Sequence, residues 1–525
     1  MSASSDGPRI LSAPIGGGPL AKAGLHGTAP AGWFSAIPQS PRAWRERAEA
    51  IHDSGNARWL SSLQPAFAAS GAALERLTKS AEGKGLVVTS GQQPGLFGGP
   101  LYTWTKALTV RALADALERA IGVPVAPVFW AATDDSDVAE GAWTTVAVPG
   151  GSQRLELTVD VAAGTPVSHV VLDGVAPLVQ GLAAACGSGT DTRALDAVRR
   201  AYRDGATVGG AYVELLRALL EPLGVAVLDA AHPAVRAAAH PLYLTALERA
   251  DHVHASLVDR TAEIRSAGYE PQVATMDDLS LVFEHRDGRR SRIARRSAQE
   301  RALSAVPGEL SPNVLLRPIA ERFLLPTLAY AAGPGEFAYF AQVSAVARAL
   351  DARPPLAVPR WSATLVEPQI DRLLARYQLT VSDLANAADV SRRLAEAAVP
   401  SDVISAVAHA RGQLDESLAS IRASLQAHDG LVPVRAVDAV ERAVAWRLDR
   451  LARRLRAGAR RRDATLTHDL GTMSGALYPE GVAQERALNI IPLLVRYGLS
   501  LLDRMTDEAR HHAEALVDRS GSRSA

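Results

Sequence analysis

The stretch that decides the fold spans residues 86–106 and reads LVVTSGQQPGLFGGPLYTWTK. Its first four residues are apolar or β-branched, which predicts a strand, and this strand breaks into a glycine-rich loop. Pro100 then suits the first turn of a helix, because its fixed φ is helical and its missing N–H is not needed there. Strand, glycine-rich loop and helix, in this order, aim backbone N–H groups and a helix dipole at an anionic or polar ligand.

The glycines of this loop match neither the dinucleotide-binding fingerprint nor a Walker A loop, because their spacing differs and no Gly-Lys-Ser/Thr follows. A tight turn that needs glycines only for its backbone is the alternative interpretation. The amide side chains of Gln92 and Gln93 favour a binding loop. We therefore expect the loop, with Gly91 and Gly95, to contact a phosphate or a carboxylate.

The composition excludes several classes of protein. Lys plus Arg and Asp plus Glu both number 56 in 525 residues, so no overall charge favours nucleic acid or a membrane surface. The single cysteine, Cys186, excludes an internal disulfide framework and fits a reducing compartment. The sequence has no basic leader with an apolar core and no run of about 18 apolar residues. We expect a cytoplasmic protein without nucleic-acid or membrane partners.

Five apolar runs alternate with segments of helical periodicity, which predicts an α/β fold with a doubly wound parallel sheet. The runs span 86–89, 125–132, 224–229, 328–332 and 356–360. Ligands of such sheets bind beyond the carboxyl ends of the strands. Polar groups follow the strands there, namely 89–93, Asp134-Asp135-Ser136-Asp137, Asp229, Gly333-Pro334-Gly335-Glu336 and Arg360.

The pattern along the chain predicts four regions. Residues 1–32, rich in Gly, Ser, Pro and Ala, are typical of a flexible leader. The core at 33–366 contains inserts at about 143–223 and 268–310, with short β-rich runs at 144–148, 154–159, 167–172 and 270–293 and a hairpin turn at Asp287-Gly288. Residues 367–475 predict an antiparallel helical hairpin or coiled coil joined near 429–433, and 476–525 predict helices that pack back on the core.

Motifs spread over roughly residues 33–500 occur in the order seen in one known family. They are 89–102, 127–130, 268–273, 311–318, 325–330, 333–336 with Tyr339, 358–360 and 484–486. The sequence thus resembles the cysteine-adding enzymes of bacillithiol biosynthesis, the BshC family. The resemblance implies a Rossmann-like core with small inserted β-containing subdomains and a helical C-terminal region that forms a homodimer through a coiled coil.

The resemblance also implies an activity. It is that of a ligase that attaches L-cysteine, by an amide bond, to the glucosamine amine of glucosaminyl malate in the last step of bacillithiol biosynthesis. ATP or ADP is the cofactor implied. Two positions depart from the family pattern, since the acidic loop usually reads Glu-Asp-His-Asp, and a Gln usually stands at the position of Glu321. A ligase of the same fold for another amino acid or amino sugar is therefore a second hypothesis.

A third hypothesis is a non-enzymatic scaffold that binds a nucleotide or nucleic acid. It rests on an arginine run in the helical region, which otherwise predicts a solvated coiled-coil face paired with neighbouring acids. The run comprises Arg447, Arg450, Arg453, Arg454, Arg456, Arg460, Arg461 and Arg462.

Amide formation needs an activated carboxyl, an unprotonated amine and groups that hold both in place. We expect Asp135, Asp137 and Gln93 to act in catalysis, with the carboxylates holding the amine or accepting its proton. Arg317 and Arg360 match the malate carboxylates. The other expected substrate-binding residues are Gln92, Gly91, Gly95, Tyr102, Lys106, Asp134, Ser136, Gly335 and Glu336. The 13 histidines show no metal-ligand spacing, so no metal site is predicted.

Overall fold

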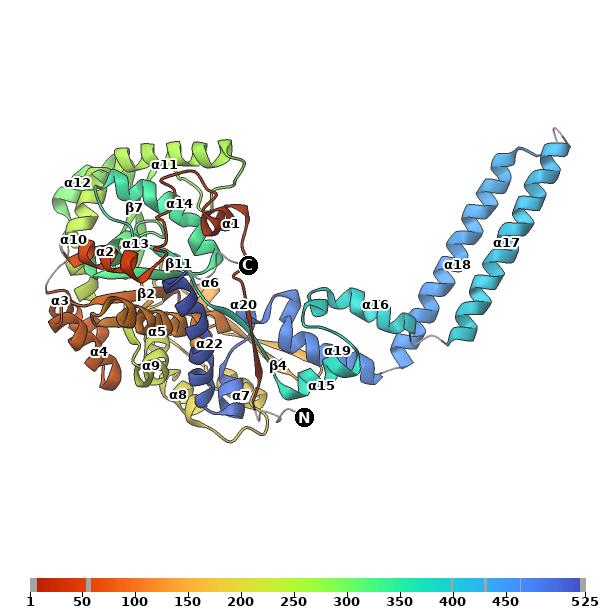
Figure 1. The fold of residues 1–525 in the computed structure, drawn as a ribbon, viewed down its shortest axis with the longest axis horizontal. Coiled ribbons are helices and arrows are strands. Elements are labelled where there is room, and N and C mark those ends of the chain that lie inside the picture. Colours follow the sequence, from red (N-terminus) through yellow and green to blue (C-terminus); the bar gives the residue numbers. More distant parts are fainter. Residues whose placement is uncertain (1–6, 53–57, 398–399, 429–431, 463, 520–525) are drawn as a thin grey trace. The chain divides into compact units, whose positions relative to one another are not determined.

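The computed structural model describes residues 7–52, 58–397, 400–428, 432–462 and 464–519. The chain divides into two compact units (Figure 1). The first unit comprises Met1–Val146, Arg154–Glu367 and Gln484–Ala525, and the second comprises Ala147–Gln153 and Pro368–Ala483. Within the described ranges, no helix has both the length and the apolar composition that a membrane span requires.

The first unit is built on a five-stranded parallel sheet with the strand order β11-β10-β2-β3-β6. The strands are β2 (Leu86–Gln92), β3 (Val125–Ala131), β6 (Ala226–Asp229), β10 (Thr327–Ala332) and β11 (Ala357–Pro359). This confirms the predicted doubly wound sheet. Numbered along the chain, the strands stand in the order 3-2-1-4-5, so the direction of winding reverses between β2 and β10. Such a reversal is where open α/β sheets bind their ligands.

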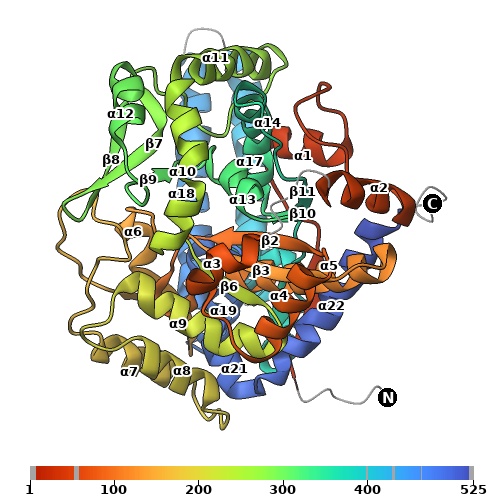
Figure 2. The ribbon, with the colours of Figure 1, turned by 90° about the vertical axis from the view of Figure 1, so that its left-hand side faces the viewer.

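Helices cover both faces of this sheet, which explains why β3 is buried along its whole length. On one face, α5 (Leu101–Ile121) packs against β2 and β3, and α9 (Val208–Leu220) packs against β6. The C-terminal helix α22 (Ser500–Val517) packs against α5. In Figure 2, α9 lies below the strands, whereas α13 and α14 lie above them.

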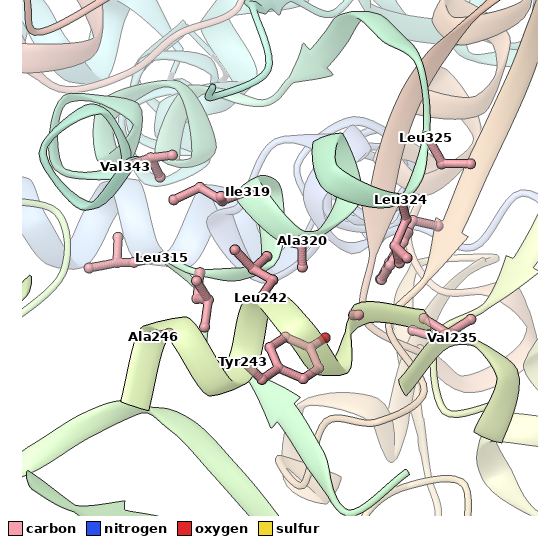
Figure 3. Close-up of a cluster of buried hydrophobic side chains, with 14 of the residues drawn as sticks. Val235, Leu242, Tyr243, Ala246, Leu315, Ile319, Ala320, Leu324, Leu325 and Val343 are labelled. Atoms are coloured by element: carbon pink, nitrogen blue, oxygen red, sulfur yellow. The ribbon is translucent and has the colours of Figure 1, made fainter. Parts of the chain in front are cut away.

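The helices of the other face share one buried cluster with the sheet. They are α10 (Pro233–Glu248), α13 (Arg317–Leu324) and α14 (Pro334–Ala349). Figure 3 shows Leu242 and Tyr243 of α10 beside Ile319 and Ala320 of α13. This packing fixes the position of α13 and α14, whose first residues stand at the edge of the sheet. Further helices of the unit are α2 (Pro41–His52), α3 (Trp59–Phe67), α4 (Gly71–Glu82), α6 (Val138–Gly141), α7 (Ala176–Ala185), α8 (Arg193–Ala201), α11 (Ala250–Ser266), α12 (Ala298–Ser304), α20 (Gln484–Ala487) and α21 (Ile491–Tyr497).

Two inserts interrupt the alternation of strand and helix. In the first, β4 (Trp143–Val148) pairs with β5 (Gly151–Glu156). The prediction of a third strand at 167–172 is wrong: the N–H groups of Val167 and Ser168 donate to the carbonyls of Asp135 and Thr133, so this segment is bound to the loop after β3. In the second insert, β7 (Leu279–Arg286) and β8 (Arg289–Ala294) form a hairpin, and β9 (Leu310–Pro312) pairs with β7. Both turn residues, Asp287 and Gly288, have positive φ, as a two-residue hairpin turn requires.

The prediction of a flexible leader is wrong for residues 7–32, while residues 1–6 lie outside the described residues. Here β1 (Arg9–Ala13) pairs antiparallel with β12 (Ser362–Val366), and Trp361 Nε1 donates to Ser12 Oγ at 2.8 Å. The helix α1 (Pro19–His26) buries Leu20 against α14. The partners of β1 and α1, which are β12 and α14, lie more than 300 residues further along the chain, so the local composition does not indicate them.

The second unit contains two long helices, α17 (Ser401–Ala427) and α18 (Val434–Arg462), which lie side by side (Figure 1). They are antiparallel, because Arg411 pairs with Asp449 at 3.0 Å while the later Arg422 pairs with the earlier Asp438 at 2.7 Å. The predicted connection near 429–433 falls mainly on 429–431, outside the described residues. The unit is completed by α15 (Pro368–Arg376), α16 (Ala387–Ala397) and α19 (Ala464–Leu477), and it ends at Ala483 rather than at residue 475.

Candidate functional site

A cavity of about 650 Å³ lies in the first unit, beyond the carboxyl ends of β2, β3 and β10. It therefore stands at the point where the strand order reverses. Most of the residues predicted from the sequence to form a site line it together: Gly91, Gln92, Gln93, Tyr102, Lys106, Asp134, Asp135, Arg317, Gly335, Glu336 and Arg360. Gly95, Ser136 and Asp137 do not line it.

Lys106 links the end of β2 to the start of α14. Its buried ammonium group donates to Gly91 O and to Gln92 Oε1, both at 2.8 Å, and lies 2.6 Å from Glu336 Oε2. Burial lowers the pKa of Lys106, and the charge of Glu336 opposes this change. Glu336 also accepts from Gly333 N at 2.8 Å and from the Tyr330 hydroxyl at 2.6 Å. The lysine and the glutamate thus hold two loops of the sheet edge in a fixed relation.

Arg317 is the first residue of α13, where Asn313 Oδ1 caps the preceding turn by accepting from Leu315 N and Leu316 N. Its guanidinium donates to the Tyr330 and Tyr339 hydroxyls at 3.1 and 3.0 Å and lies 3.4 Å from Glu321 Oε2.

Glu321 is completely buried and accepts a hydrogen bond from Thr89 Oγ1. Burial raises the pKa of Glu321 to about 7. Glu321, one of the two positions that depart from the family pattern that the sequence resembles, thus places a buried carboxyl directly behind Arg317 and does not itself line the cavity.

The acidic loop after β3 brings two carboxylates to the cavity. Asp135 accepts from the Gln93 side chain, from Ser136 N at 2.6 Å and from Asp137 N at 3.1 Å. Asp134 is buried, and burial raises the pKa of Asp134, with the charge of Asp135 acting in the same direction and nearby arginines opposing it. Asp135 is therefore held in place by donors, while Asp134 has the properties of a proton acceptor.

The structure gives Ser136 and Asp137 a different role from the predicted one. Asp137 is exposed and caps α6, where its Oδ1 accepts from Glu140 N at 3.2 Å. The backbone of both residues holds Asp135, whereas neither side chain lines the cavity. An acidic run before a short helix serves both purposes, and the sequence alone does not separate them.

Gly95 lies outside the cavity, because the glycine loop packs on itself. A Cβ on Gly95 would lie 2.6 Å from the Cα of Gly99. Two of the loop amides are bonded within the loop, since Gly98 N donates to Gly95 O and Gly99 N donates to Leu96 O, both at 3.1 Å. Asn489 Nδ2 donates to Phe97 O at 3.0 Å from the other side. The amides of Gly98 and Gly99 are thus not available to a phosphate, whereas Gly91, near the end of β2, does line the cavity.

Arg360 is buried and directs most of its donors at the protein itself. Its terminal nitrogens bond both oxygens of Glu485, at 3.0 and 2.8 Å, and Nη1 also reaches Thr105 Oγ1 at 3.2 Å. Arg360 Nε is buried without a hydrogen-bond partner in the described structure. One donor of Arg360 therefore remains for a ligand, rather than the bidentate fork predicted from the sequence.

Sequence reasoning missed the part of the cavity wall that the β7–β8 hairpin supplies. Arg290 and Arg292 line the cavity, and their guanidinium carbons lie 3.8 and 5.0 Å from the ring centre of Phe283. Arg290 Nη1 lies 3.7 Å from Asp135 Oδ1. The alternation of Arg290 and Arg292 after the Asp287-Gly288 turn places them on one face of a strand, which was a readable signal. The sequence does not predict that this face contacts the acidic loop, which lies about 150 residues earlier.

Away from the sheet edge the cavity is apolar. The side chains of Ala246, Ala250, Val253 and Leu257 from α10 and α11 form one wall there, and Val273 and Met276 face them. Gln342 holds this segment, because its side chain bonds both the N–H and the carbonyl of Val273, at 3.0 and 2.7 Å. The cavity thus has a charged end and an apolar end, as sites for polar molecules with an apolar part do.

Comparisons with known proteins show the family of the chain. The family model described as "Bacillithiol biosynthesis BshC, N-terminal Rossmann-like domain" matches residues 30–361, and that of the "C-terminal coiled-coil domain" matches residues 363–515. The chain is 36% identical over 464 residues to a protein of Koribacter versatilis, with 83% of each chain covered. It is 35% identical over 443 residues to one of Solibacter usitatus, which covers 82% of this chain and 84% of the relative. Both relatives carry the name "Putative cysteine ligase BshC". The chain therefore belongs to the BshC family of bacillithiol biosynthesis.

Proposed function

We propose that this chain is a ligase that forms an amide bond between the carboxyl group of L-cysteine and the amine of glucosaminyl malate, the last step of bacillithiol biosynthesis. The observation that carries the proposal is the charged end of the cavity, where Asp134, Asp135 and Lys106 face one space at the reversal of the strand order. The names of the relatives support cysteine as one substrate.

The amine of the sugar must lose a proton before or during its attack on the carboxyl carbon. Asp134 takes this proton, because its raised pKa brings a carboxylate closer to the value at which proton transfer is efficient near neutral pH. Asp135 holds the amine by a charged hydrogen bond, since Gln93 and two backbone N–H groups fix its own orientation. The amine nitrogen then forms the new C–N bond while a C–O bond of the cysteine carboxyl breaks, and this oxygen would leave with the phosphoryl-containing group that ATP supplies.

The carboxyl group of cysteine needs donors on the opposite side. Arg360 Nε is a buried donor without a partner in the described structure, and Gly333 and Lys106 are its neighbours. Activation of the carboxyl by ATP is part of the proposal. Two amides of the glycine loop, those of Gly98 and Gly99, are bonded within the loop, and Gly95 does not line the cavity. We therefore assign no residue to a nucleotide.

A homodimer through the helical hairpin is a further part of the proposal. Five large apolar side chains of α17 and α18 are between 44% and 55% exposed: Ile404, Ile421, Val440, Trp446 and Leu451. A second hairpin would remove these side chains from water. Light scattering should give the mass of two chains for the wild type and of one chain for Ile421→Glu/Val440→Glu. The exposed Ala423→Glu is the control.

The experiment that tests the ligase is incubation of the purified chain with glucosaminyl malate and cysteine, with and without ATP, followed by mass spectrometry. A cysteinyl product that requires ATP supports the whole proposal, and a product without ATP removes the nucleotide from it. The same tubes with serine or alanine, and with other amino sugars, test a changed substrate. Product only in those tubes would favour the second hypothesis, whose structural basis is Glu321 behind Arg317.

A further inference from the structure

The charged groups around the cavity differ in whether the protein itself satisfies them. Lys106 lies 2.6 Å from Glu336, Arg317 lies 3.4 Å from Glu321, and Arg360 is bonded to Glu485. These cations are neutralised by the chain. An anionic substrate would have to compete with a buried or partly buried carboxylate at each of them, which costs several kcal/mol per displaced partner.

Arg292 and Arg486 differ from these three cations, because no ion pair or hydrogen bond of either side chain occurs in the described structure. Arg292 contacts the ring of Phe283, whose centre lies 5.0 Å from the guanidinium carbon. Burial lowers the pKa of Arg292, and the neighbouring Arg290 adds to this effect. A cation that lines a cavity beside another cation, without a carboxylate of its own, gains most from a bound anion.

The position of Arg292 relative to Asp135 indicates which part of a substrate reaches it. Arg290 lies 3.7 Å from Asp135 and over the same Phe283 ring as Arg292. Side chains two positions apart on one strand are about 7 Å apart. In glucosaminyl malate the amine and the malate stand on neighbouring carbons of the sugar. A sugar whose amine lies at Asp135 and whose first carbon faces β8 places its malate within reach of Arg292.

We propose that Arg292, stacked on Phe283 in the β7–β8 hairpin, binds a carboxylate of the malate group and makes the enzyme specific for an anionic aglycone. This inference rests on the proposed function for the identity of the sugar. Arg290 balances Asp135 and completes the same face of the hairpin. The insert thus supplies the specificity for the aglycone, while the sheet edge supplies the groups for amide formation.

Isothermal titration with two sugars tests this assignment without turnover. One is glucosaminyl malate, and the other is methyl glucosaminide, which has the amine but no carboxylate. We expect Arg292→Gln to raise the Kd of glucosaminyl malate about 10- to 100-fold, which is the effect of losing one charged hydrogen bond. The Kd of methyl glucosaminide should stay within about twofold. Arg292→Lys should restore part of the affinity for glucosaminyl malate, because it restores the charge but not the planar fork.

Two matched variants control the experiment. Arg289→Gln removes an exposed arginine from the opposite face of the same strand and should leave both values of Kd unchanged. Arg486→Gln removes another cation that lines the cavity, near Tyr102. The proposal would be overturned if Arg486→Gln, and not Arg292→Gln, selectively lowered the affinity for glucosaminyl malate. An equal loss of affinity for both sugars in Arg292→Gln would overturn it as well.

A titration with ADP separates a malate site from a phosphate site. If Arg292→Gln weakens the binding of ADP and not that of glucosaminyl malate, Arg292 binds a phosphate and the proposal is wrong. Wild-type protein that binds glucosaminyl malate no more tightly than methyl glucosaminide also contradicts it. Tight, Arg292-dependent binding without any cysteinyl product would instead support the aglycone site and reject the proposed ligase activity.

Discussion

The sheet edge and the β7–β8 hairpin face the same cavity but treat their charges in different ways. At the sheet edge, Lys106, Arg317 and Arg360 each oppose a buried or half-buried glutamate. On the hairpin, Arg290 stands 3.7 Å from Asp135, and Arg292 has only the Phe283 ring.

This difference separates two uses of charge. Paired charges at the sheet edge fix the loops that follow β2 and β10, so removing one partner exposes the other to an unfavourable environment. A cation without a partner on the hairpin contributes little to the fold and can contribute fully to a ligand. Substitutions at the sheet edge should therefore change stability and activity together, and substitutions on the hairpin should change binding alone.

The largest effect is expected from Lys106→Met. The variant removes the closest cation of the largely buried Glu336 and leaves only Arg317, at 4.0 Å, which should lower the free energy of unfolding by about 3–5 kcal/mol and abolish product. Lys79→Met is the control, because its pair with Glu118 has a similar distance of 2.7 Å but a lysine side chain that is 63% exposed. We expect at most about 1 kcal/mol there. Urea unfolding followed by tryptophan fluorescence measures both, and equal losses would contradict the role of burial.

The next largest effect is expected on the rate. Asp134→Asn removes the proposed proton acceptor and should reduce kcat by about 100- to 10,000-fold. Asp137→Asn is the matched control, since asparagine also caps a helix and Asp137 lies outside the cavity. Its kcat should remain within about threefold of the wild type. Initial rates of product formation by mass spectrometry compare the two. A larger loss in Asp137→Asn would restore the assignment made from the sequence.

The sequence predicts the cavity residues of the sheet edge far better than those of the hairpin, for a physical reason. Strands, glycine turns and polar residues at strand ends are local patterns, and a parallel sheet brings such ends to one edge whatever lies between them. Gln93, Asp135 and Glu336 could therefore be assigned to one site from the sequence, and all three line the cavity.

Pairings between distant segments have no local signature, and the missed features are of this kind. Arg360 pairs with Glu485, the leader strand β1 pairs with β12, and Arg290 reaches Asp135. The motif at 484–486 was visible in the sequence, but its contact with Arg360 was not. Gly95 shows the opposite case, because a local pattern that permits anion binding also permits the close packing of Gly95 on Gly99.

A smaller effect, dependent on pH, is expected from Glu321→Gln. The pKa of Glu321 is raised from 4.5 to about 7, so the folded chain binds this proton more tightly than the unfolded chain. Its contribution to stability is complete below about pH 4.5 and is lost as the pH rises to about 7, a change on the order of 3 kcal/mol. Urea unfolding at pH 5 and pH 8 should show this decline in the wild type and a smaller one in Glu321→Gln. An equal change in the free energy of unfolding between pH 5 and pH 8 in the two proteins would exclude titration of Glu321.

The smallest effect is expected from Gly95→Ala, which tests whether the glycine loop packs or binds. The new methyl group would lie 2.6 Å from the Cα of Gly99, so the loop must shift, at a cost of about 1–3 kcal/mol in unfolding free energy. Gly16→Ala is the control, because a Cβ there meets nothing within 4 Å and should change stability by less than about 0.5 kcal/mol. If the loop only packs, the Kd of ADP should be the same in both variants at a temperature where both are folded. A selective loss of ADP affinity in Gly95→Ala would return the loop to the ligand site, and the sheet edge would then hold an anion as the hairpin does.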